Sequence, residues 1–212
     1  MAKIRIDIVS DVACPWCYVG KRRLETALAS RPDIEADIHW RPYMLDPTIP
    51  KEGYPRKAYM TSKFGSAERA TEMFDRVSAE AEREGLAFDM DAITVSPNTL
   101  DAHRLIHWAA AEGVQDAMKE ALLKAFFVDA RDVGDRDVLV EIAEAVGLDG
   151  AAIRAKLATD EDVALIEAEI AEARQIGVTG VPCFIVDRRV GLSGAQPPEA
   201  ILETIDRVLA ER

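Results

Sequence analysis

The chain has 212 residues, 49% hydrophobic and 30% charged, a composition typical of a globular protein that needs no staples to hold its core. Its 26 basic residues are scattered and face 38 acidic ones, so the net charge of -12 disfavours nucleic acid as a partner. Three cysteines are too few for a disulfide scaffold. No secretion signal or membrane-spanning run is evident. We therefore expect a cytoplasmic protein of one or two domains with no membrane partner.

The N-terminal third predicts a β-α-β unit. Apolar and polar residues alternate along residues 3–8, which is typical of a half-buried strand. A helix is expected over residues 15–29, with Pro15 at its first position, where a missing N–H is tolerated. A second alternating strand follows at residues 34–40.

The middle of the chain predicts helices. Residues 42–55 contain four prolines and are expected to form an irregular connection. Over residues 56–176, apolar residues recur at helical spacing, and we expect about six helices and no strand. Asp135 and Thr159 are expected to cap two of these helices.

The C-terminal segment returns to strands. Residues 183–193 read as a hairpin with a polar turn, and an amphipathic helix is expected after Pro197 and Pro198. The predicted order is therefore β-α-β, a helical block, and β-β-α.

Cys14 and Cys17 form a CPWC motif at the junction of the first strand and the first helix. The free N–H groups and the positive dipole end of a helix N-terminus favour the thiolate, which is the nucleophilic form of cysteine. We expect Cys14 to be the exposed attacking thiol and Cys17 the buried resolving thiol. The basic run Lys21 to Arg23 is expected to be solvated, with a small effect on the thiolate.

Two other interpretations of the cysteine pair remain open. A structural zinc site needs four ligands. The pair supplies two, and the remaining candidates are Cys183, His39, His103 and His107. Alternatively, the cysteines are small buried apolar residues with no chemistry. For His103 and His107, four residues apart, a packing role is favoured over ligation.

Several segments together resemble the DsbA-like oxidoreductases, and within them the FrnE-like branch. The segments are IDIVSDVACPWCYVGKRRLE, WRPYMLDPTIP, SPNTLDAHRLIHWA, ALLKAFFVDARDVGDRDVL and GVTGVPCFIVDRRVGLSGAQPPE. The resemblance implies an α/β thioredoxin fold with an inserted all-helical domain. Residues 1–55 and 177–212 would form the thioredoxin-fold domain, and residues 56–176 the insertion.

The same resemblance implies a thiol-disulfide oxidoreductase or disulfide isomerase that acts on protein disulfides or small thiols. Cys14 and Cys17 would be its catalytic residues, and their reversible disulfide its redox centre, with no metal or organic cofactor and with glutathione as a possible redox partner. A cis Val181-Pro182 peptide would face the cysteines, with Val181 presenting its backbone to an extended substrate. Trp16 would border the substrate surface.

Three further residues near the predicted site carry expectations. Cys183 is a candidate auxiliary redox sulfur, although a buried packing role is favoured. Asp7 and Asp11 are candidates for the buried acid that thioredoxin-fold enzymes often keep beneath the disulfide.

The resemblance also extends to glutathione-dependent 2-hydroxychromene-2-carboxylate isomerases and kappa-class transferases, which use serine where this chain has Cys14. A second sulfur at Cys17 favours dithiol exchange over this alternative. A non-enzymatic metal-binding or interaction protein is the remaining alternative. Trp16 stands where DsbA has a histidine between its cysteines, which favours a less oxidising couple and a reductase or isomerase role.

Overall fold

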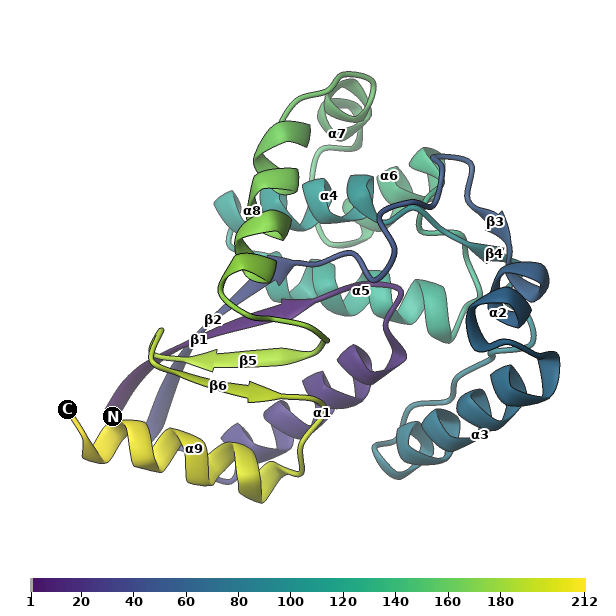
Figure 1. Cartoon of the computed structure of the whole chain (residues 1–212). Helices are drawn as coiled ribbons and strands as arrows, with labels where there is room; N and C mark the ends of the chain where they lie inside the picture. Colours follow the sequence, from purple (N-terminus) through teal and green to yellow (C-terminus); the bar gives the residue numbers. More distant parts are fainter. Residues whose placement is uncertain (1) are drawn as a thin grey trace.

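The computed structural model describes residues 2–212, and its central feature is a four-stranded mixed sheet (Figure 1). The strand order is β2-β1-β5-β6, with β1 and β2 parallel and β5 antiparallel to both of its neighbours. The strands are β1 (Ala2–Ser10), β2 (Ile34–Pro42), β5 (Cys183–Val186) and β6 (Val190–Ser193). The predicted β-α-β and β-β-α halves therefore join in one sheet.

The core explains the alternation seen in the sequence. Ile4, Ile6 and Ile8 of β1 are each 1% exposed, and they share a core with α1 (Pro15–Ala29) and α9 (Pro198–Ala210). On β5, next to β1, Phe184 belongs to this same core. Because successive side chains of a strand point to opposite faces, Val9 and Cys183 belong to a separate, smaller cluster.

Between β2 and β5 the chain forms seven helices, one more than expected, and two very short strands. The strands, β3 (Tyr54–Pro55) and β4 (Val95–Ser96), pair with each other, so the expectation of no strand in this region is wrong. The helices are α2 (Arg56–Phe64), α3 (Ala67–Arg83), α4 (Leu100–Ala111), α5 (Gln115–Phe127), α6 (Arg136–Ala145), α7 (Gly150–Leu157) and α8 (Val163–Gln175). This is a thioredoxin-like fold with a helical insertion, as expected.

Helices α5 and α8 of the insertion lie against the edge strand β2 (Figure 1). Gln115 satisfies the free edge of β2 in both directions: its Oε1 accepts from Trp40 N at 3.0 Å, and its Nε2 donates to Trp40 O at 3.3 Å. The indole Nε1 of Trp40 donates to Asp116 Oδ1 at 2.9 Å. These contacts fix α5 beside the sheet and close to α1.

The helix caps are partly as expected. Asp135 caps α6 by accepting from the N–H groups of Asp137 and Val138. Thr159 caps no helix, because it lies in the turn after α7, where its hydroxyl donates to Lys156 O. The N-cap of α8 is Asp162. Within residues 2–212, no helix is both long and apolar enough to cross a membrane.

Candidate active site

The cysteine pair lies at the N-terminus of α1. Cys14 occupies the N-cap position, Pro15 begins the helix, and Cys17 lies in the first turn, where its N–H donates to Cys14 O at 3.0 Å. The Cys14 side chain therefore lies among N–H groups that have no intrahelical acceptor, at the positive end of the helix dipole. This placement is the one that the sequence predicts.

The Val181-Pro182 peptide is cis and lies against Cys14. The Cys14 Sγ donates to Val181 O at 3.4 Å, across 167 positions of sequence. Cys14 is consequently only 4% exposed. The expectation that the attacking thiol is exposed is therefore wrong. Cys17 is fully buried, as expected.

Burial raises the pKa of the Cys17 thiol well above its usual value, and a hydrogen bond with Cys14 and the charge of Cys14 raise it further. The charge of Lys119 acts in the opposite direction. Cys17 is therefore a thiol that must lose a proton before it can attack, as expected of a resolving cysteine.

Gly20 lets the cis-proline loop approach α1 closely. A Cβ at this position would lie 2.9 Å from Pro182 Cγ and 3.2 Å from Phe184 Cζ. The ring of Pro182 is rigid, so it can yield only if the loop moves. A residue without a side chain is therefore required where the helix meets the loop.

Alanine at position 20 is expected to lower stability by about 1–3 kcal/mol through overpacking, although alanine is intrinsically the better helix former. It should also speed alkylation of Cys14, because displacing Val181 uncovers a thiol that is only 4% exposed. Thermal unfolding and iodoacetamide kinetics measure the two effects. Gly180→Ala is the matched control, because a Cβ there meets nothing within 4 Å. Equal stability and reactivity of Gly20→Ala and the wild type would contradict the close contact.

Asp11 ties the cysteine loop to the segment after β2. Its carboxylate accepts from Leu45 N at 2.8 Å and from Ala13 N at 3.3 Å. Its Oδ1 also lies 3.5 Å from Nε2 of His103. Burial alone would raise the pKa of Asp11, but these bonds outweigh burial and hold its pKa below the usual range. Asp11 is thus a structural carboxylate, whereas Asp7 pairs with Arg5 and Arg41.

The structure also places the other residues that the sequence analysis names, Trp16, Cys183 and the candidate zinc ligands. Trp16 is partly buried and packs against the main core. Cys183 is buried in the smaller cluster, and burial raises the pKa of its thiol, which favours the packing role over a reactive one. Within residues 2–212, His, Cys, Asp and Glu side chains form no group of three placed to hold a metal ion.

Two lysines near the pair depart from expectation. Lys21 is 3% exposed and pairs with Glu25, Asp116 and Glu120, so the expectation that it is solvated is wrong. Lys119 of α5 is fully buried, and the sequence analysis does not select it. The other buried residues of this helix are apolar. The local sequence indicates this burial only by placing a charged residue among the regularly spaced apolar residues of the helix.

Comparison with known proteins decides the family. Residues 5–206 match the DSBA-like thioredoxin domain family. The crystal structure of a probable DsbA oxidoreductase from Streptomyces coelicolor is 40% identical and has a TM-score of 0.90, covering 99% of this chain and 91% of that chain. This chain belongs to the DSBA-like thioredoxin domain family.

More distant structures share the fold. A 2-hydroxychromene-2-carboxylate isomerase is 13% identical with a TM-score of 0.75, covering 98% of this chain and 97% of its own. The cytosolic disulfide reductase DsbM from Pseudomonas aeruginosa, solved with GSH, is 22% identical with a TM-score of 0.65. The match covers 96% of this chain and 99% of DsbM. The fold alone therefore does not separate dithiol chemistry from isomerisation.

Proposed function

We propose that this family member catalyses thiol-disulfide exchange on protein or small-thiol disulfides through Cys14 and Cys17. The observation that carries the proposal is the placement of Cys14 at the N-cap of α1, with Cys17 one turn inward and the Val181 carbonyl 3.4 Å from Cys14 Sγ. Membership of the FrnE-like branch is part of the same proposal.

The exchange proceeds in two balanced steps. The Cys14 thiolate attacks a substrate disulfide, forming a mixed disulfide and releasing one substrate sulfur as a thiolate that takes up a proton. Cys17 then loses its proton and attacks the Cys14 sulfur, which releases the second substrate thiol. The substrate gains two electrons and two protons, and the enzyme forms the Cys14-Cys17 disulfide.

A hollow beside the cysteine loop supports a peptide as substrate. It is small, about 30 Å³, and is bordered by the apolar residues Ala13, Leu45, Ile49 and Met60 and by polar ones that include Asp46, Arg56 and Lys63. Leu45 is a large apolar residue that is 42% exposed at this edge. We propose that an extended substrate chain pairs with the backbone of Val181, as in edge-strand recognition, and packs on Leu45.

We propose a reducing or isomerising role in the cytoplasm rather than net oxidation. Trp16 carries no charge that would stabilise the reduced form, in contrast to the histidine of strongly oxidising DsbA. DsbM, with the same fold, is named a cytosolic disulfide reductase and was solved with GSH, which supports glutathione as a redox partner here.

Reactivation of scrambled ribonuclease in a glutathione buffer tests this role. The reduced wild type is expected to accelerate reactivation, and Cys14→Ser to leave only the background rate. If the wild type does not accelerate reactivation but isomerises 2-hydroxychromene-2-carboxylate with glutathione, the isomerase alternative replaces the proposal. The second sulfur weighs against that alternative, because an isomerase needs no resolving thiol.

A further inference from the structure

Lys119 is a buried cation with no acceptor. Its side chain is 0% exposed, and no hydrogen-bond partner for Nζ exists among residues 2–212. Its Nζ lies over the face of the Trp40 ring, 5.3 Å from the ring centroid. Burying an ammonium without a partner is costly, so a lysine here calls for a role other than packing.

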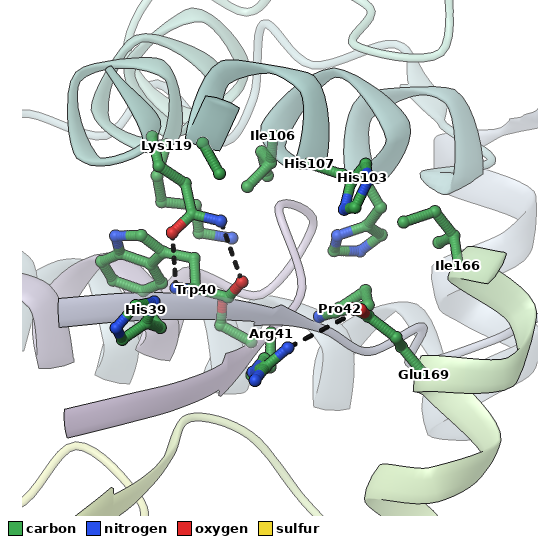
Figure 2. A pocket seen from close by; sticks show the side chains of 13 residues that line it. His39, Trp40, Arg41, Pro42, His103, Ile106, His107, Lys119, Ile166 and Glu169 are labelled. Carbon is green, nitrogen blue, oxygen red and sulfur yellow. Dashed lines mark hydrogen bonds and ion pairs between the residues drawn. The ribbon is translucent and has the colours of Figure 1, made fainter. Parts of the chain in front are cut away.

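Helix α5, which carries Lys119, packs on α1, which carries Cys17. Tyr18 Oη donates to Glu120 Oε1 at 2.6 Å. Tyr18 directly follows Cys17 in the sequence, and Glu120 directly follows Lys119. Lys119 also lines a cavity of about 210 Å³ with Trp40 and His103 (Figure 2). Ser10, the last residue of β1 before the cysteine loop, lines the same cavity.

Charges around Lys119 come from four directions. The groups on α1 and its preceding loop are Cys17, Cys14, Asp11 and Lys21. Those that line the cavity with it from β2, α4 and α8 are His39, Arg41, His103, His107 and Glu169. Arg41 is already paired with Asp7 and Glu169, and His103 with Tyr43 O and Asp11. Lys21 has three carboxylates, whereas Lys119 has none bonded to it.

Among the anions that face Lys119, the Asp11 carboxylate already accepts from Leu45 N and Ala13 N and lies beside His103, which leaves the thiolates that form at the two cysteines. We propose that Lys119 is the positioning residue for the resolving step, its ammonium stabilising the Cys17 thiolate as Cys17 attacks the mixed disulfide. This inference rests on the proposed function and adds a buried lysine to the buried carboxylates of Asp7 and Asp11 that the sequence analysis names.

The electrostatics of both groups agree with this assignment. Burial lowers the pKa of Lys119, while Cys17 foremost, then Asp11 and Cys14, favour its charged form. Burial raises the pKa of Cys17, and Lys119 lowers it. Each charge is therefore unfavourable alone and favourable beside the other, so loss of the proton from Cys17 is assisted when Lys119 is charged.

Reaction with Ellman's reagent separates the two steps. The Cys14 thiolate attacks the reagent disulfide and releases one thionitrobenzoate, leaving a mixed disulfide on Cys14. The Cys17 thiolate then attacks Cys14 and releases the second thionitrobenzoate as the enzyme disulfide forms. In a Cys183→Ala background, the two phases of release report Cys14 and Cys17 in turn.

Lys119→Met is expected to slow the second phase about tenfold or more at neutral pH, because each unit by which a thiol pKa rises lowers its thiolate fraction about tenfold below that pKa. The pH midpoint of this phase should move upward, and the first phase should change less. The difference from the wild type should vanish well above the pKa of Cys17. The fold should persist, since methionine has a similar volume and no hydrogen bond is lost.

Lys124→Met is the matched control. Lys124 lies on the same helix but is half exposed and pairs with Asp129, so its loss should leave both phases unchanged. An unmoved pH midpoint in Lys119→Met, with two phases intact in the wild type, would overturn the role of Lys119. Release of a single thionitrobenzoate by the wild type would instead contradict the proposed dithiol chemistry.

Discussion

Replacement of Cys14 by serine is expected to abolish disulfide exchange, with a loss of roughly a thousandfold or more in the rate constant. Cys14 is the thiol at the N-cap of α1, next to N–H groups that have no intrahelical acceptor. Burial raises the pKa of the Cys17 and Cys183 thiols, and neither occupies the N-cap of a helix, so neither is expected to take over the attack. The rate of reduction of a fluorogenic peptide disulfide measures the effect.

Cys183→Ser is the matched control for this variant, because it removes a buried sulfur of the same fold and is expected to retain most of the activity. Appreciable exchange by Cys14→Ser, or its loss in Cys183→Ser with the fold intact, would contradict the assignment of Cys14 as nucleophile.

Replacement of Cys17 by serine is expected to trap the enzyme as a mixed disulfide. The first attack requires only Cys14, whereas release requires a second thiol within reach of the Cys14 sulfur. With Cys17 absent, turnover should fall to the rate at which external thiol resolves the complex. Non-reducing gel electrophoresis and mass spectrometry after mixing with a cysteine-containing peptide disulfide measure the adduct.

The cysteine that carries the adduct identifies the attacking thiol. It should lie on Cys14, and added glutathione should release it. If Cys17→Ser turns over as fast as the wild type, or the adduct lies on Cys183, the division of labour between the two cysteines is wrong.

The sheet and the helices that flank it could be predicted because their signals are local. Alternating isoleucines mark β1, and Pro15 marks the first position of α1. The helical insertion was harder to divide. Asp149, Thr159 and Asp162 are all residues that favour N-caps, and only tertiary packing determines that α7 begins after Asp149 and α8 after Asp162.

Of the site, the sequence predicts the residues that lie close together along the chain, but not the contacts between distant segments. The cysteine pair is contiguous, so the motif itself indicates its chemistry. The burial of Lys119 depends on how α5 packs, and the bonds that Gln115 and Asp116 make to Trp40 of β2 join segments 75 and 76 positions apart. For the same reason, the burial of Lys21 by Glu120 of α5 leaves no trace in the local sequence.

The reduction potential of the Cys14-Cys17 pair tests the central claim most directly. The Cys183→Ala protein would be equilibrated against glutathione buffers and, for the lower potentials, dithiothreitol buffers, after treatment with a chelator. Mass spectrometry would then count the remaining thiols and locate the bond. We predict a Cys14-Cys17 disulfide with a potential between about -120 and -270 mV, the span from DsbA to thioredoxin. Absence of this disulfide across that range would contradict the dithiol account.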